Sequence, residues 1–360
     1  MFNIIPLEYY GSIFYWMTFF LVFLVFIRLK NNQTLTNATT IQFALTIGLF
    51  LYIGLRPISG IYFGDMGSYS RYFESYKYGY TGSFEQDPGF DWFMKKTSSF
   101  LGVELFFLVL AFIYVFAHYW ASKRLFNKHW YYAFLIMVAS ISFWSFGTNG
   151  MRNGLAAALV LLAFSFEKKK TIAIALAIVA VSFHRSMSLP VLAYALTFAN
   201  NNSKYYFLMW LLCIPASLIF GSAFEILFAS IGIADQRLSY LIEGNVNDDD
   251  FSSIGFRWDF LLYSASAVFA GYYFIIKKQF KDALYQRLLN VYLISNGFWI
   301  LVIRANFSNR FAYLSWFMMG LVIIYPFLKG NLLKNQTQTL AYVLLVYSLF
   351  TLVLNVLLVN

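Results

Sequence analysis

Four arginines stand at or near the start of an apolar segment: Arg152, Arg185, Arg257 and Arg310. A guanidinium presents a planar fork of donors that suits bidentate binding of phosphate or carboxylate. A helix amino terminus carries partial positive charge, so a cation there is disfavoured by about 0.3–1 kcal/mol. Four arginines at such positions indicate a shared anionic ligand, to which backbone N–H groups at the helix ends would also donate. The alternative is that each arginine pairs with nearby acids or with lipid phosphate.

Two residues near these arginines have the chemistry of a base. Asp65 lies between glycines that let the backbone approach a ligand closely. Its alternative role is an ion pair with Arg56 or Arg71. His184 titrates near neutral pH, and the neighbouring Arg185 should lower its pKa and keep it neutral, as a base requires. Its alternative role is a hydrogen-bonding group at a helix end.

The sequence lacks the motifs of several well-known classes of enzyme. The chain has no Walker loop, no dinucleotide fingerprint, no H-E-x-x-H and no G-x-S-x-G. Its one cysteine, Cys213, has no partner for a disulfide or a metal cluster. The one plausible cation pair, Asp248 and Asp250, lies in a long polar loop. We expect neither a metal nor a cofactor.

The composition indicates a membrane protein. Of 360 residues, 60% are apolar, 22% aromatic and only 12% charged, about half the charged fraction of a soluble protein. The formal charge is +10, but the basic residues are scattered between apolar blocks, so no nucleic-acid partner is expected. We predict an all-α, polytopic integral membrane protein with one transmembrane domain over residues 1–360.

About twelve transmembrane helices are predicted, since a bilayer core takes about 20 apolar residues of helix. Two of the runs, over 152–183, are short and suit tilted or partly re-entrant segments. The apolar runs lie near residues 9–27, 41–55, 100–120, 130–147, 152–166, 170–183, 187–199, 205–222, 258–276, 288–303, 311–328 and 338–359.

The distribution of charge predicts the orientation. Alternate connections hold nearly all the lysines and only two acids, Glu167 and Asp282, which places them in the cytoplasm. Both termini are then expected outside. The other side is rich in arginine instead of lysine, which topology alone does not explain: Arg56, Arg71, Arg152, Arg185, Arg237, Arg257, Arg304 and Arg310.

Two predicted external loops are long enough to carry a site, at about 56–99 and 223–257. Both are rich in aromatic and acidic residues. Aromatic rings beside a bilayer serve as interfacial anchors, and they are also surfaces on which sugar rings pack. The internal loops are short, so the working surface is predicted to be external.

The order of several short motifs resembles the EpsG-like branch of the Wzy polysaccharide polymerases, over about residues 50–320. The chain has Asp87 where this family commonly has Glu, and Arg152-Asn153 where it commonly has Arg-Gln, so Asp87 receives no definite chemical role. The motifs are Arg56…Phe63-Gly64-Asp65…Tyr69, Asp87-Pro88-Gly89-Phe90, Asn149-Gly150-Met151-Arg152-Asn153-Gly154-Leu155-Ala156, Phe183-His184-Arg185-Ser186 and Asn309-Arg310-Phe311-Ala312-Tyr313.

The resemblance implies a GT-C-like helical fold and a metal-independent, processive glycosyltransferase in the bacterial inner membrane. The donor would be a glycan on undecaprenyl diphosphate, transferred on the periplasmic face to the non-reducing end of a new lipid-linked repeat of O-antigen, capsule or exopolysaccharide. Membrane lipids and a chain-length regulator of the pathway are the other expected partners.

The expected site combines these residues. Asp65 and His184 are the candidate catalytic bases. Arg152 and Arg310, followed by Arg185, Arg304 and Arg257, are expected to bind the diphosphate. Glycan or acceptor contacts are expected from a weaker set: Arg56, Arg71, Tyr69, Asp87, Asn149 and Tyr313.

Other functions remain open. A flippase or other transporter of lipid-linked oligosaccharides would need charged groups along a path through both leaflets, whereas here they crowd one end of the helices. An O-antigen ligase shares the donor and the use of arginine, and only the order of motifs favours the polymerase. A membrane O-acyltransferase would need a more obvious histidine-centred site.

Overall fold

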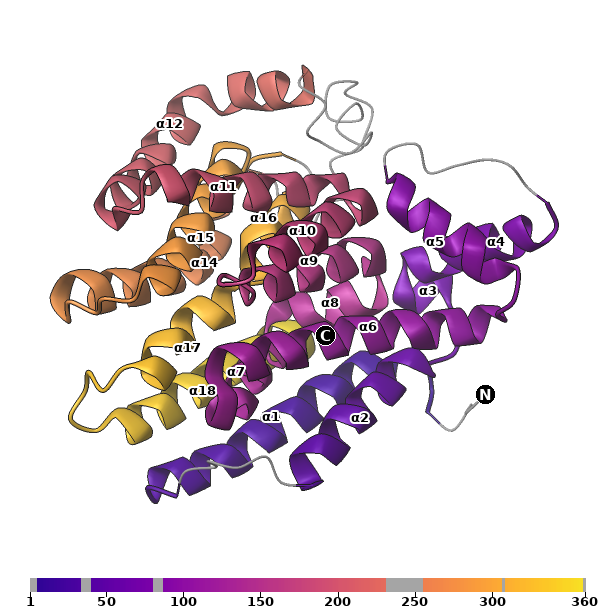
Figure 1. Ribbon diagram of the computed structural model, residues 1–360, viewed down its shortest axis with the longest axis horizontal. Helices are drawn as coiled ribbons and strands as arrows, with labels where there is room; N and C mark the ends of the chain where they lie inside the picture. Colours follow the sequence, from indigo (N-terminus) through magenta and orange to yellow (C-terminus); the bar gives the residue numbers. More distant parts are fainter. Residues whose placement is uncertain (1–4, 34–39, 80–86, 231–254, 306–307, 359–360) are drawn as a thin grey trace. The chain divides into compact units, whose positions relative to one another are not determined.

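The computed structural model describes residues 5–33, 40–79, 87–230, 255–305 and 308–358, and within these the chain is helical without a strand (Figure 1). Short 3-10 helices occupy Asn127–His129 and Arg185–Met187, and π-helical turns occupy Tyr273–Lys277 and Val353–Leu357. The α-helices are α1 (Tyr9–Lys30), α2 (Thr40–Gly54), α3 (Gly60–Phe63), α4 (Asp65–Lys77), α5 (Pro88–Ser98), α6 (Val103–Phe126), α7 (Trp130–Val138), α8 (Ile141–Thr148), α9 (Met151–Phe164), α10 (Lys170–Phe183), α11 (Ser188–Ala199), α12 (Ser203–Ser230), α14 (Trp258–Tyr272), α15 (Ala283–Leu301), α16 (Asn309–Trp316), α17 (Met319–Lys329) and α18 (Gln336–Leu352).

The prediction of a polytopic helical membrane protein is confirmed. Every predicted apolar run contains helix in the described residues. In the part of the chain that the structure describes, six helical stretches are long and apolar enough to cross a membrane, and α2, α9 and α10 are shorter apolar helices. The acidic pair Asp248 and Asp250, and Arg237, lie outside the described residues.

Two predicted runs differ in detail from a single helix. The run 130–147 is divided into α7 and α8, because Ser140 adopts an extended conformation (φ −76°, ψ 150°) before α8 begins. The run 311–328 is divided into α16 and α17 around Phe317. A buried segment is apolar on all of its faces whether it forms one helix or two. Its apolar pattern therefore does not reveal a break in the helix.

Packing divides the chain into two compact units. Unit 1 comprises residues 1–185 and 327–360, and unit 2 comprises residues 186–326. In unit 1, α1 packs on α18, α2 on α6, and α9 against α6, α8 and α10. In unit 2, α15 packs against α11, α12 and α16.

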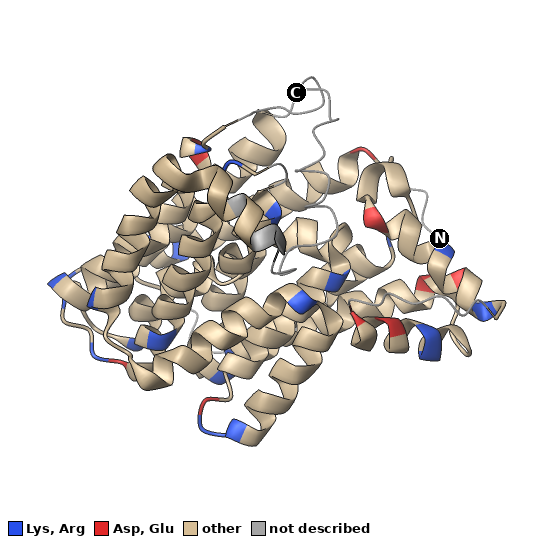
Figure 2. Ribbon diagram, turned by 90° about the horizontal axis from the view of Figure 1, so that it is seen from above, with Lys and Arg blue, Asp and Glu red and all other residues tan. Residues whose placement is uncertain are grey.

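The helices of unit 1 have a basic end and a site end. Lysines and arginines stand at the ends of α1 and α6, and at the start of α10. At the opposite end, which we call the site end, α2, α8 and α10 end and α9 begins. The short helices α3, α4 and α5 of the 56–99 connection lie at the same end. Figure 2 shows acidic residues at the right of the view, the side on which Figure 1 labels α4 and α5.

Local sequence explains the helices in the described residues of the connection, 56–79 and 87–99. The Ser59 side chain accepts a hydrogen bond from the Tyr62 backbone N–H at 3.2 Å and caps α3. Pro88 occupies the first turn of α5, where its missing N–H costs nothing. The predicted loop is therefore a small helical layer that holds Asp65 and Asp87 at its helix starts.

Unit 2 is organised around a buried polar network on α15. Trp210 Nε1 donates to Asn296 Oδ1 at 2.7 Å, and Asn296 Nδ2 donates to Ser315 Oγ at 3.0 Å. These bonds tie α12, α15 and α16 together, because a buried amide must find partners in an apolar interior. Helix α12 contains Pro215 and is kinked at Phe220.

Candidate functional site

A buried ion pair lies at the site end of unit 1. Arg152, the second residue of α9, places Nη1 2.7 Å from Oδ2 of Asp87, the residue before α5. The Asp87 side chain is 5% exposed and that of Arg152 is 19% exposed. The arginine is therefore held in one position by a carboxylate that is nearly removed from water.

The other oxygen of Asp87 holds a third segment. Its Oδ1 accepts a hydrogen bond from the Arg185 backbone N–H at 2.8 Å. One carboxylate thus joins the start of α5, the start of α9 and the residues that follow α10. The Arg185 side chain is exposed.

His184 stands in the same turn, between α10 and the 3-10 helix. Burial, and then the positive charge of Arg152, lower the pKa of His184 below its ordinary value. The sequence predicts Arg185 as the cation that lowers this pKa. In the structure the charge that does so is that of Arg152. His184 is half-buried. The imidazole is therefore neutral at neutral pH.

Asp65, at the start of α4, is joined to the turn that precedes Arg152. Its backbone N–H donates to Oδ1 of Asn149 at 3.0 Å. Gly64 has φ +50°, and a Cβ added there would lie 2.2 Å from that same oxygen, so only glycine fits. The Asp65 carboxylate forms no ion pair with Arg56 or Arg71 within the described residues.

A second glycine permits the approach of α5 to α10. A Cβ added at Gly89 would lie 2.1 Å from Ser182 Oγ and 3.0 Å from the Ser182 carbonyl carbon. Helix α5 therefore approaches the end of α10 closely, which is what brings Asp87 to the Arg185 backbone.

Arg56 has a role in the interior of unit 1. It is 1% exposed, and its Nη2 donates to the Thr148 carbonyl at 2.9 Å while Nη1 donates to the Ile53 carbonyl. Both carbonyls lie in the last turn of a helix, α2 or α8, where partial negative charge favours a cation. Burial lowers the pKa of Arg56, but an arginine keeps its charge at neutral pH. With so little exposed surface, Arg56 positions the turn to α9.

The remaining weaker candidates of unit 1 differ in exposure. Tyr69 is buried and packs against Phe90, with ring centroids 5.5 Å apart. Arg71 is exposed and donates to Ser68 Oγ at 3.2 Å. Asn149 is exposed at the turn between α8 and α9. Arg71 and Asn149 are thus accessible to a ligand, and Tyr69 belongs to the core.

Four predicted residues belong to unit 2. Arg257 is held by both oxygens of Asp259, at 2.9 Å and 2.6 Å, and lies over the Phe260 ring. Arg304 is exposed, and its Nη2 lies 3.5 Å from the Leu218 carbonyl. Arg310 is exposed at the start of α16, and Tyr313 packs on Trp316. The geometry of these residues is described within unit 2 alone.

The family now follows from a comparison with family models. The EpsG family model matches residues 40–360. The chain belongs to the EpsG family. A comparison with curated proteins and one with solved structures each give no match. Membership supports a polysaccharide polymerase-like role for this EpsG chain, with a glycosyltransferase-like activity, in a membrane.

Two contacts of this EpsG site are not predictable from the sequence. The sequence indicates no definite chemical role for Asp87 and only a weak contact to glycan or acceptor, whereas the structure pairs its carboxylate with Arg152. The weak ligand contact of Arg56 stays a prediction; the structure places this residue between two helix carboxyl ends, which the sequence does not report. In the described residues, no group of three or more His, Cys, Asp or Glu side chains could hold a metal ion.

Proposed function

We propose that this EpsG-family chain polymerises undecaprenyl-diphosphate-linked oligosaccharide repeats at the external face of the bacterial inner membrane. The observation that carries the proposal is the Arg152–Asp87 ion pair beside a neutral His184, at the end of unit 1 opposite its basic connections. Lysine-rich connections favour the cytoplasm. The site and both chain termini then face the periplasm.

The proposed reaction is a displacement at a sugar carbon. The non-reducing hydroxyl of a new lipid-linked repeat attacks the anomeric carbon of the growing glycan, forming a glycosidic C–O bond. The bond from that carbon to the diphosphate oxygen breaks, and undecaprenyl diphosphate leaves with the electron pair. The hydroxyl proton passes to a base.

Arg152 is suited to the leaving group in this reaction. Negative charge develops on the diphosphate as it departs, and a cation fixed in advance stabilises that charge without reorganising. Asp87 supplies the fixation through its 2.7 Å contact. Because an arginine fulfils this role directly, we propose a metal-independent reaction. Arg310, Arg304 and the exposed Arg185 side chain are proposed as further contacts to the lipid-linked diphosphates.

His184 and Asp65 remain the proposed bases. His184 is neutral and half-buried beside Arg152. Asp65 is fixed at its backbone by Asn149, three residues before Arg152. His184→Gln and Asp65→Asn preserve shape and remove basicity. At least one of them should yield a folded protein that binds lipid-linked repeats and does not extend them; normal extension by both would exclude both residues as the base.

The proposal is tested with purified protein in detergent, where translocation has no meaning. Wild type should convert undecaprenyl-diphosphate-linked repeats into a ladder of longer glycans. Arg152→Lys keeps the charge and loses the planar fork, so it should reduce the ladder strongly at unchanged expression. Arg124→Lys, the same change at the basic end of α6, is the matched control and should extend normally.

Other outcomes would identify another function. A wild-type ladder from Arg152→Lys would remove Arg152 from the site. Transfer of the glycan to a lipid A core without extension of the lipid-linked repeat would establish a ligase. Movement of the lipid-linked repeat across the membrane of vesicles without any transfer would establish a flippase.

A chain-length regulator is the proposed protein partner. When it is added to the assay, it should alter the length distribution of the ladder.

A further inference from the structure

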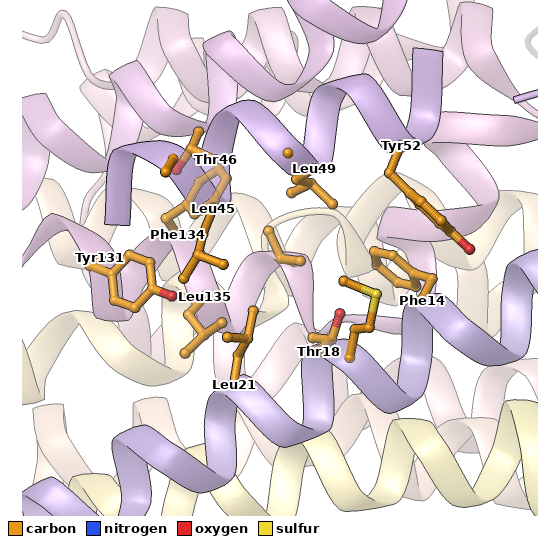
Figure 3. Close-up of a pocket in the computed structure, with 14 residues that line it drawn as sticks. Phe14, Thr18, Leu21, Leu45, Thr46, Leu49, Tyr52, Tyr131, Phe134 and Leu135 are labelled. Carbon is orange, nitrogen blue, oxygen red and sulfur yellow. The ribbon is translucent and has the colours of Figure 1, made fainter. Parts of the chain in front are cut away.

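An apolar slot lies between α1 and α2, with α7 as its floor (Figure 3). Its cavity volume is about 200 Å³, room for a segment of a chain. Most of its walls are aliphatic or aromatic. They come from Phe14, Met17, Thr18 and Leu21 on α1, from Ala44, Leu45, Thr46, Gly48, Leu49 and Tyr52 on α2, and from Tyr131, Phe134, Leu135 and Val138 on α7.

The slot is elongated along the helices. On each of the three helices the lining residues recur every three or four positions, as on α2 from Ala44 through Gly48 to Tyr52. Eight residues of helix rise about 12 Å. Figure 3 shows Tyr52 and Phe14 at one end and Tyr131 toward the other. This shape accommodates an extended hydrocarbon chain better than a compact ligand.

The slot opens sideways. Helix α1 packs mainly on α18 and α2 mainly on α6, and the two are joined at the Tyr52 end, where the Tyr52 hydroxyl donates to the Tyr10 carbonyl at 2.8 Å. Met17 at the rim is 53% exposed, and a Cβ added at Gly48 would meet nothing within 4 Å. In a membrane-spanning bundle, an exposed apolar rim faces lipid. A chain already in the bilayer can therefore enter without crossing water.

One end of the slot packs against the helix that leads to the site. Phe14 and Tyr52 pack against Trp144 of α8, with ring centroids 4.8 Å and 6.1 Å apart. Four residues on, the Thr148 carbonyl accepts the Arg56 bond that fixes the turn to Arg152. The wall of the slot and the backbone that carries Arg152 are thus consecutive turns of the same segment.

We propose that this slot binds the isoprenoid chain of a lipid-linked substrate, with its diphosphate directed toward the site end of unit 1. The assignment rests on the proposed function for its choice of chain. A single elongated slot suits a polyprenyl tail more than a phospholipid, which carries two acyl chains and belongs in the bilayer.

Chain-length selectivity tests the assignment in the detergent assay. Gly48→Phe fills the slot from a position where nothing blocks the new side chain. It should lower kcat/KM at least tenfold for an undecaprenyl-diphosphate-linked repeat and leave it unchanged for the same repeat on a two-isoprene lipid. Ile47→Phe, on the exposed face of the same helix, is the control and should match wild type. An equal loss with both lipids would overturn the proposal.

A binding measurement on the wild-type protein separates the slot from the activity. A benzophenone-bearing isoprenoid diphosphate should crosslink to α1 or α2, and excess polyprenyl diphosphate should compete while phosphatidylglycerol should not. Crosslinks there without polymer formation would support the slot and refute the proposed function. Polymer formation with crosslinks elsewhere, or equal competition by phosphatidylglycerol, would overturn the slot and leave the function standing.

Discussion

Replacing Asp87 by Asn should disable the site without removing a side chain from it. The amide is nearly isosteric, and its oxygen can still accept the Arg185 N–H that Asp87 Oδ1 accepts at 2.8 Å. Its NH₂ group, however, would face Arg152 Nη1, which now lies 2.7 Å from a carboxylate oxygen. Two donors repel, and the guanidinium must move.

The structure gives the size of the effect. Removing one partner of a buried ion pair costs about 3–5 kcal/mol because the other charge stays buried. Arg152 is 19% exposed, so water relieves part of this, and we expect about 2–3 kcal/mol from that range. At about 1.4 kcal/mol per tenfold, a loss of that size in transition-state stabilisation lowers kcat/KM by roughly 30- to 150-fold.

A double-mutant cycle provides the assay. Asp87→Asn, Arg152→Gln and the double variant are compared in glycan extension and in thermal stability in detergent. If the pair acts as a unit, the double variant should be about as impaired as the worse single variant. Asp91→Asn is the matched control, since Asp91 is a buried acid on the same helix, paired with Lys95 at 2.8 Å. It should lower stability and spare activity. Additive losses from Asp87 and Arg152 would refute the reasoning.

Three further predictions concern the residues around this pair. Arg56→Met leaves two helix-end carbonyls without their cation; because bonds to charged groups contribute about 1.5–3 kcal/mol each, the melting temperature should fall with the activity, and an unchanged melting temperature would contradict the buried role. Gly64→Ala should reduce extension because its Cβ meets Asn149, whereas Gly79→Ala, also at positive φ but in open space, should not; equal effects would exclude the Asn149 contact. The pKa of His184 is lowered from 6.5 in the folded protein. The free energy of unfolding should therefore fall as the pH drops through 6.5, because the histidine of the unfolded chain takes up a proton there, while kcat/KM stays level over the same range. An inflection in kcat/KM near pH 6.5 that His184→Gln removes would contradict this.

The sequence was sufficient to predict the helices, because lipid-facing and buried positions are both apolar and membrane helices read as long apolar runs. The same property hid the break at Ser140, since one buried helix and two have the same composition. It also hid α3, α4 and α5 in the 56–99 connection, which follow from a Ser59 cap and from Pro88 at a helix start.

The sequence predicts which residue types form the site better than it predicts their contacts. The position of Arg152 at a helix start and the glycines around Asp65 are both visible in the sequence. Which side chains pair, however, depends on which helix ends meet. Asp87 and Arg152 are 65 positions apart in the chain, and their contact requires α5 to lie against α10, which the small size of Gly89 allows.

Arg152 is proposed to stabilise undecaprenyl diphosphate as it leaves during polymerisation. One measurement follows undecaprenyl diphosphate release and glycan extension together, with purified wild-type and Arg152→Lys protein and one defined lipid-linked repeat. Wild type should release one undecaprenyl diphosphate per repeat added, and Arg152→Lys should lose both signals in parallel despite retained substrate binding. Extension at the wild-type rate by Arg152→Lys, or release of undecaprenyl diphosphate without any extension by wild type, would exclude this role for Arg152.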